Sequence, residues 1–123
     1  MDITPRKDPV LVVDDNDDLA KCLADMVEVF GLECVRVSDG HQAIEELAKS
    51  EFSLVITDTQ IPRMSGFTLL KHIRKNYPGT PVAVMSTRNS DMTKGIVVKD
   101  RVDYYLPKPF KLADIEKLLK SIS

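Results

Sequence analysis

The sequence predicts an α/β fold in which a doubly wound, five-stranded parallel sheet has helices on both faces and the strand order 2-1-3-4-5. Two observations predict this class. After Pro9, strand-like apolar runs alternate with helix-like segments five times, and strands separated by helices of about ten residues imply right-handed crossovers. The first and third runs both end in aspartates, which suits strands that flank the point where the strand order reverses.

The composition indicates one globular domain. The chain has 123 residues and a net charge of −2, which is enough length for a buried core and too little basic charge for binding nucleic acid or a membrane surface. No apolar stretch approaches the roughly 20 residues of a membrane-spanning helix, and the first residues lack a signal-peptide core, so we expect a cytoplasmic protein. Cys22 and Cys34 lie in apolar-periodic contexts, where we expect buried, reduced side chains.

The first elements follow from the apolar pattern. Residues 1–8 read as a flexible, polar lead-in, and residues 9–123 as the folded domain. The run Val10–Val13 predicts the first strand. A helix is expected from about Asn16 to Phe30 because one stripe is apolar, and Gly31 is suited to end it.

The second strand and second helix have local signals. Glu33–Val37 alternates apolar and polar residues, which favours an edge strand with one wet face. Asp39 then caps a helix, with Gln42 three residues later as its capping-box partner. The third strand, Leu54–Thr57, is apolar until it reaches Asp58.

A loop with Pro and Gly is expected over residues 60–66, followed by a helix over Gly66–Asn76. Val82–Met85 predicts the fourth strand. The segment Asn89–Val102 contains Gly and consecutive β-branched residues, so it predicts only a weak, mobile helix.

The chain then reaches its last two elements. Tyr104–Leu106 predicts the fifth strand, and Leu112–Ile122 the final helix. The fifth strand leads directly into Lys108, which lies between two prolines.

Five chemically active side chains follow these strands. Asp14 and Asp15 follow the first strand, Asp58 the third, Ser86 the fourth and Lys108 the fifth. The carboxyl ends of parallel strands meet at one edge of a sheet, so we expect these groups to converge. Three carboxylates close together are costly without a cation, and Mg²⁺ prefers oxygen ligands. The set could therefore hold a divalent cation and a phosphoryl group.

A simpler structural interpretation exists for each of these charged residues. The run from Asp15 to Asp18 could serve only to cap the first helix and complement its dipole, an interpretation that fits Asp17 and Asp18. Asp14 and Asp15 come directly after a buried apolar run, which favours a site. Asp58 alone could be a turn former, and Lys108 a solvated surface charge.

Together these residues resemble the receiver domain of two-component response regulators, as found in chemotaxis regulators, with its flavodoxin-like fold. The likeness extends from about Pro9 to Ile122. It is carried by Asp14-Asp15, by Asp58 with Pro and Gly four and eight positions later, by Ser86 at 28 positions beyond Asp58, and by Lys108-Pro109-Phe110 at 50.

The resemblance implies that Asp58 accepts a phosphoryl group from a sensor histidine kinase or a histidine phosphotransfer protein. It implies Mg²⁺, or Mn²⁺ in its place, held by Asp15 directly, by Asp14 largely through water, by Asp58 and by the backbone carbonyl of Gln60. Lys108 would neutralise charge on the phosphoryl group. The protein would then catalyse only its own phosphorylation and dephosphorylation and is not otherwise expected to be an enzyme.

The resemblance also implies a conformational switch. Ser86 would bond a phosphoryl oxygen, and Tyr105 would turn inward behind it; Thr87 and Tyr104 are the competing choices one position away. The surface around the weak helix, the last strand and the last helix would act on an output domain, a downstream protein or a second copy of the chain.

The sequence departs from the family pattern at several positions. Gln60 and Arg88 occupy positions that tune the lifetime of the phosphoryl group. Arg101-Val102 replaces a common Gly-Ala, and Ile61 stands where Met is common. None of these changes removes a reactive group.

Three other functions compete. A receiver fold could act as a docking or dimerisation module without phosphorylation. A haloacid-dehalogenase-type phosphotransferase would need a carboxylate where Gln60 stands. A flavin or dinucleotide carrier would need a Gly-rich or hydroxyl-rich phosphate loop after the first strand, where this chain has acidic residues. The chain ends at Ser123, which fits either a complete single-domain regulator or the receiver of a longer protein.

Overall fold

The structure, a computed structural model, describes residues 8–86 and 102–122. Of the predicted lead-in it describes only Asp8, and of the predicted weak helix only Val102. Thr87 and Arg88 also lie outside the described residues, and Ser86 is described only as the backbone end of a strand.

A five-stranded parallel sheet forms the centre of the molecule. Its strands are β1 (Val10–Val13), β2 (Cys34–Val37), β3 (Leu54–Asp58), β6 (Val82–Ser86) and β7 (Tyr104–Pro107), in the order β2-β1-β3-β6-β7. Counted along the chain, this is the predicted order 2-1-3-4-5, so the fold-class prediction is confirmed.

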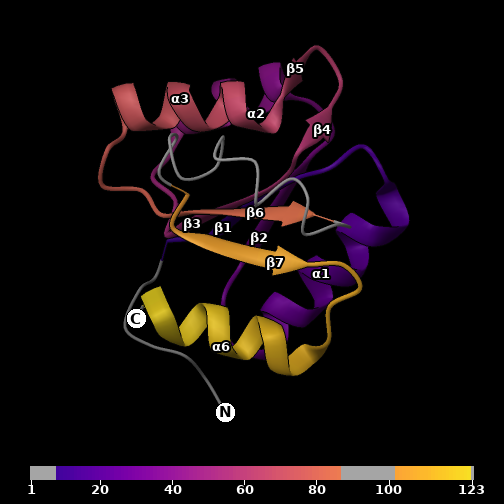
Figure 1. The fold of residues 1–123 in the computed structure, drawn as a ribbon. Helices are drawn as coiled ribbons and strands as arrows, with labels where there is room; N and C mark the ends of the chain where they lie inside the picture. Colours follow the sequence, from indigo (N-terminus) through magenta and orange to yellow (C-terminus); the bar gives the residue numbers. More distant parts are fainter. Residues whose placement is uncertain (1–7, 87–101, 123) are drawn as a thin grey trace.

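Of the helices that the structure describes, two cover each face of the sheet. Helices α1 (Asp17–Val29) and α6 (Leu112–Ile122) lie on one face, and α2 (Gly40–Lys49) and α3 (Gly66–Asn76) on the other (Figure 1). The sheet thus separates two apolar cores. Side chains that alternate along one strand belong to different cores, as with Val10 on the α1–α6 side and its neighbour Leu11 on the α2–α3 side.

The position of each strand in the sheet explains its sequence pattern. All four residues of β1 are completely buried, because β1 has a neighbour on both sides and helices on both faces. The edge strand β2 is only half-buried and exposes Arg36, as its alternation predicts.

Local capping signals set where the helices begin. Asn16, Asp39 and Ser65 each accept a hydrogen bond from the backbone N–H three residues later, at the starts of α1, α2 and α3. The capping box predicted for α2 is modified, because the Gln42 side chain accepts from the Ser38 N–H at 2.8 Å instead of from the Asp39 N–H. At the other end of α1, Gly31 has a φ of 89°, the left-handed conformation expected of a glycine stop.

One predicted loop is a small hairpin. The segment after Asp58 forms two short antiparallel strands, β4 (Gln60–Ile61) and β5 (Met64–Ser65). Arg63 in the turn has a φ of 75°, which is uncommon outside glycine. Two-residue strands carry no periodicity, so the pattern alone predicts only a loop.

The cysteine prediction is half wrong. Both thiols are free, but Cys22 is exposed on α1 and only Cys34 is partly buried. Burial raises the pKa of the Cys34 thiol to about 12. Among the described helices, none has the length and hydropathy needed to cross a bilayer.

Candidate functional site

The candidate site lies at the carboxyl-terminal edge of the sheet. Asp14 directly follows β1, Asp58 is the last residue of β3, and Lys108 directly follows β7. The register pairs Val13 with Thr57, so Asp14 and Asp58 continue from adjacent, level strand ends. Parallel pairing therefore brings these three side chains together from positions far apart in the sequence.

The Lys108 ammonium bridges the two carboxylates. Its Nζ donates a hydrogen bond to Asp58 Oδ2 at 3.0 Å and lies 3.7 Å from Asp14 Oδ2. The Lys108 side chain is only 16% exposed and that of Asp58 20%, so water screens this contact less than it screens a surface pair. The site holds one fixed positive charge between two acidic groups.

Asp14 is the most buried charged group of the site. Only 2% of its surface is exposed. Its Oδ1 accepts from the Asn16 N–H at 3.0 Å, whereas Oδ2 accepts no hydrogen bond from any residue that the structure describes. Burial raises the pKa of Asp14, although the Asn16 N–H and the Lys108 charge oppose this and the neighbouring Asp58 and Asp15 reinforce it.

The backbone around Asp58 is held by its next neighbours. The Thr59 N–H donates to Asp58 Oδ1 at 2.7 Å, which orients the carboxylate. The Gly66 N–H donates to the Thr59 carbonyl at 2.8 Å. A Cβ at Gly66 would lie 2.1 Å from the Asp58 carbonyl oxygen, so only glycine allows this close approach.

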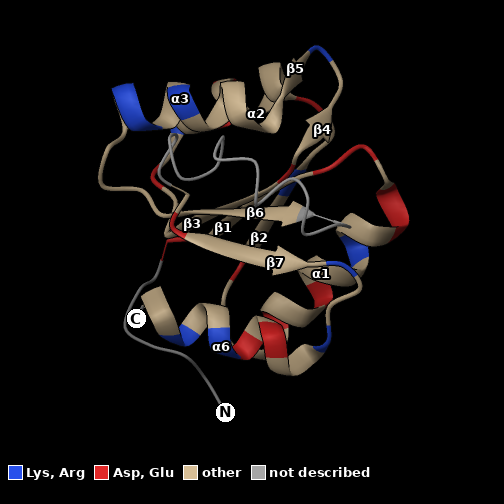
Figure 2. Ribbon diagram, in the orientation of Figure 1, with Lys and Arg blue, Asp and Glu red and all other residues tan. Residues whose placement is uncertain are grey.

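Not every predicted site residue joins this contact. Asp15 is exposed at the start of the β1–α1 turn, and Gln60 is exposed in β4. Within residues 8–86 and 102–122, no three His, Cys, Asp or Glu side chains gather as a metal-ligand group. The acidic stretch between β1 and α1 nevertheless stands beside the site (Figure 2). Asp14, Asp58 and Lys108 are the residues that the structure brings together.

The two tyrosines of β7 have different surroundings. Tyr104 packs against the core on the α1–α6 side, and its hydroxyl donates to the Ser121 carbonyl at 3.2 Å. Tyr105 is 37% exposed. The backbone of Ser86 pairs with Pro107 in the neighbouring strand, which puts the end of β6 at the same edge as Lys108.

Sequence reasoning missed two supporting residues. Asn16 was expected only at the start of a helix, yet its backbone N–H also holds Asp14. Thr59 was not singled out, yet it orients Asp58. Both lie within two positions of an acidic residue, so the signal was their place in the turn and not their own residue type.

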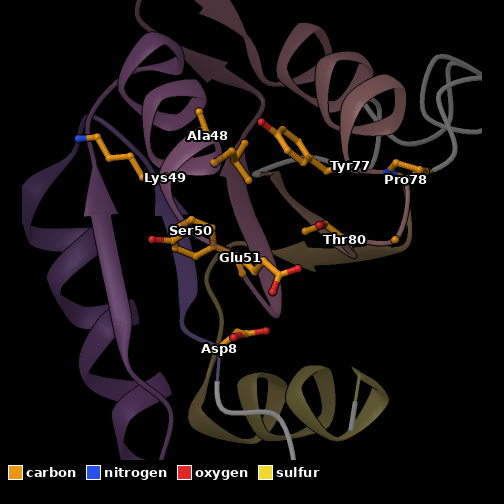
Figure 3. A pocket seen from close by; sticks show the side chains of 11 residues that line it. Asp8, Ala48, Lys49, Ser50, Glu51, Tyr77, Pro78 and Thr80 are labelled. Atoms are coloured by element: carbon orange, nitrogen blue, oxygen red, sulfur yellow. The ribbon is translucent and has the colours of Figure 1, made fainter.

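Depressions lie at both edges of the sheet. One of about 470 Å³ is lined by Leu19, Cys22, Lys108, Pro109 and Phe110, and so adjoins the candidate site. Another, of about 670 Å³, lies at the opposite edge, between the ends of α2 and α3 and near Asp8 (Figure 3). None of the predicted site residues lines it.

Comparisons with known proteins agree with this geometry. The profile of the family described as "Response regulator receiver domain" matches residues 10–120. Transcriptional regulatory protein CpxR of Escherichia coli K12 is 30% identical over 113 residues, which cover 92% of this chain and 48% of CpxR. The DNA-binding transcriptional regulator NtrC of the same organism is 31% identical over 112 residues, covering 90% of this chain and 24% of NtrC. The chain therefore spans half or less of these relatives.

A solved structure of a response regulator also resembles this chain. The chemotaxis response regulator CheY4 of Vibrio cholerae has a TM-score of 0.88 with this chain at 27% identity, over 96% of this chain and 100% of CheY4. The fold of this chain is therefore similar to that of a solved response regulator.

Proposed function

The chain belongs to the family of response regulator receiver domains of two-component systems, and we propose that it accepts a phosphoryl group on Asp58 in a Mg²⁺-dependent reaction. The observation that carries the proposal is the contact of Lys108 with Asp58, beside a buried Asp14 oxygen that has no donor among the described residues. An ammonium group held beside a nucleophilic carboxylate suits phosphoryl transfer, because it stabilises the negative charge on the phosphoryl oxygens.

The proposed reaction is a transfer between two nucleophiles. An Asp58 carboxylate oxygen attacks the phosphorus of a phosphohistidine on a partner protein; the new P–O bond forms an acyl phosphate, and the P–N bond breaks. The leaving imidazole keeps the electron pair and takes up a proton. Lys108 stabilises the charge on the phosphoryl oxygens, and Thr59 orients the carboxylate. Such transfers depend mainly on positioning and electrostatics.

The oxygen donors fit a hard divalent cation. Asp15, Asp58 and the Gln60 carbonyl would hold Mg²⁺ directly, and Asp14 would hold it largely through water; Mn²⁺ would suit the same donors. The buried Asp14 Oδ2 supports this fit, because it accepts no hydrogen bond from the described residues and the Lys108 ammonium lies 3.7 Å away, beyond hydrogen-bond distance. When bound, the cation would neutralise charge on the transferring group.

The switch would use Ser86 and Tyr105. The Ser86 hydroxyl would bond a phosphoryl oxygen, and Tyr105 would then turn inward. Tyr105 suits this role better than Tyr104, because Tyr105 is partly exposed whereas Tyr104 is packed and bonded to the final helix. Gln60 and Arg88 would set how long the phosphoryl group survives.

The partners follow from the same reaction. We propose a sensor histidine kinase or a histidine phosphotransfer protein as donor, a cytoplasmic location, and residues 9–123 as the receiver unit. The apolar depression beside Lys108 supports an approach by a protein partner from that side. An output domain, a downstream protein or a second copy of the chain would read the switch.

Phosphorylation by a small donor tests the proposal. The protein is incubated with acetyl phosphate and Mg²⁺ and weighed intact by mass spectrometry, with Asp58→Asn and a chelator-treated sample beside it. One added phosphoryl group, absent from both controls, is the expected result. Absence of the added group together with absence of Mg²⁺ binding would overturn the proposal and leave a docking module.

A further inference from the structure

The hairpin that follows Asp58 touches helix α2 as well as the site. Its β5 strand lies beside the start of α2 (Figure 1). At its base, the Gly66 N–H donates to the Thr59 carbonyl at 2.8 Å. At its tip, Arg63 contacts the residue that caps α2, and Met64 contacts the first residue of α2. The hairpin is therefore held at both ends, with Gln60 between them.

The first tip contact is the packing of Met64 on Gly40. A Cβ at Gly40 would lie 2.3 Å from Met64 Cγ and 2.5 Å from Met64 Sδ, so the methionine side chain lies directly on the glycine backbone. Gly40 is buried at the first turn of α2, and Met64 packs against the α2–α3 core. Any larger residue at Gly40 would have to displace the Met64 side chain and would so disturb the contact between the hairpin and the helix.

The second tip contact is an ion pair. Arg63 Nη1 lies 3.7 Å from Asp39 Oδ2, while Asp39 Oδ1 caps α2 by accepting from the Gln42 N–H at 2.8 Å. The Arg63 side chain is 64% exposed, so this pair is the weaker contact. One aspartate thus serves both the helix start and the hairpin tip.

We propose that Gly40, Met64 and Arg63 are positioning residues that set the Mg²⁺ affinity of the site through the hairpin. Gln60 pairs with Ser65, and Met64 is the residue next to Ser65. A shift of the Met64 contact is therefore transmitted across this pair to the Gln60 backbone, which carries a proposed ligand. The inference rests on the proposed function, because it assumes that the Gln60 carbonyl is a ligand.

Coupling of this kind is reciprocal. If the contact with α2 favours cation binding, then bound cation favours the contact by the same factor. The start of α2 is accordingly linked to the phosphorylation site, although none of its residues touches Asp58 in the described contacts.

Magnesium titration of tip variants tests the inference. Mg²⁺ dissociation constants are measured by calorimetry for Met64→Ala and for the conservative Met64→Leu, and unfolding by urea is followed in chelator. Loss of a residue that supports a metal ligand weakens metal binding by about 10-fold. We expect a weakening of up to about 10-fold for Met64→Ala, the smallest weakening for Met64→Leu, and an intermediate one for Gly40→Ala.

A matched control separates positioning from general destabilisation. Leu118→Ala removes a buried side chain from the opposite core and should lower stability without changing the Mg²⁺ dissociation constant. Unchanged Mg²⁺ affinity in Met64→Ala and Gly40→Ala, with wild type binding normally, would overturn the inference alone. Absence of Mg²⁺ binding by the wild type would instead overturn the metal part of the proposed function, and this inference with it.

Discussion

Two pairs of a carboxylate and a cation lie at opposite ends of the same sheet, and they are built differently. Arg74 and Asp103 form an ion pair at the amino-terminal edge, where β6 and β7 begin. Lys108 and Asp58 form the other at the carboxyl-terminal edge, where β3 and β7 end. Both pairs join segments far apart in the sequence.

The amino-terminal pair has further backbone partners. Asp103 Oδ2 accepts from Arg74 and from the Val82 N–H at 2.8 Å, and Arg74 Nη1 donates to the Thr80 carbonyl at 2.9 Å. The pair therefore ties the end of α3 to the starts of two strands. Asp103 Oδ2 and both terminal nitrogens of Arg74 thus have bonding partners within the protein.

The carboxyl-terminal pair lies beside a carboxylate oxygen that could still accept a hydrogen bond or bind a cation. Lys108 has two acidic neighbours, and one buried Asp14 oxygen accepts no hydrogen bond among the described residues. A buried group without its partner costs free energy, which a ligand that supplies the partner recovers. The Arg74–Asp103 pair, bonded to two strand starts, therefore suits a role in stabilising the fold, whereas the Lys108–Asp58 pair, beside an Asp14 oxygen without a described hydrogen bond, suits a binding site.

Removing the Lys108 charge should have the largest effect. Lys108→Met keeps an aliphatic side chain and loses the ammonium beside Asp58. Loss of one group that stabilises transition-state charge typically costs about 100-fold in rate. We therefore expect phosphorylation by acetyl phosphate to slow by about that factor, as measured by the time course of the intact mass.

Lys111→Met is the matched control, because Lys111 is exposed and three residues away. Its phosphorylation rate should remain that of the wild type. If Lys108→Met were phosphorylated as fast as Lys111→Met, Lys108 would have no role in the reaction. The Lys108–Asp58 pair would then serve only the fold, like the Arg74–Asp103 pair.

The corresponding change at the other edge should affect stability instead. Arg74→Met removes the bonds to Asp103 and to the Thr80 carbonyl. Because Asp103 is 40% exposed, the loss of unfolding free energy should be modest, about 1.5 kcal/mol. Urea unfolding followed by circular dichroism measures it.

The same variant tests the contrast between the edges. Phosphorylation of Arg74→Met should proceed at the wild-type rate when the protein is folded. A slowing as large as that of Lys108→Met would mean that the amino-terminal pair also acts on the site.

Much of the fold and of the site can be predicted from the sequence, for a physical reason. Apolar runs that end in charged residues identify both the strands and their direction, and parallel pairing then places those charges at one edge. Asp14, Asp58 and Lys108 meet for this reason, although Lys108 and Asp58 are 50 residues apart.

The remaining features depend on contacts that leave no local pattern. Arg74 and Asp103 are 29 residues apart, and neither follows an apolar run in a way that predicts its partner. The hairpin after Asp58 depends on a left-handed Arg63, a conformation that arginine does not signal. The burial of Asp14 Oδ2 away from any described hydrogen-bond donor results from three-dimensional packing, of which the sequence indicates only that Asp14 follows a strand.

Neutralising Asp14 should change stability least, and it should raise the free energy of unfolding, whereas Arg74→Met lowers it. In Asp14→Asn the side-chain oxygen can still accept from the Asn16 N–H, while the charge is lost. Burial raises the pKa of Asp14 above its ordinary value of 3.8, so the ionised form is disfavoured in the folded state. We expect the variant to have a higher free energy of unfolding than the wild type near neutral pH in chelator, because it no longer buries a charged carboxylate.

The pH dependence of this gain identifies its cause. The native state of the wild type binds the Asp14 proton more tightly than the unfolded state does, so acidification relieves the cost of the buried charge. The difference between wild type and Asp14→Asn should therefore be full above the native pKa and should vanish as the pH falls through it towards 3.8. Urea unfolding of both proteins across this range measures the difference. A gain that persists at low pH would have to come from packing. Loss of stability near neutral pH would mean that attraction to Lys108 outweighs burial and that this pair, like the one at the other edge, serves the fold.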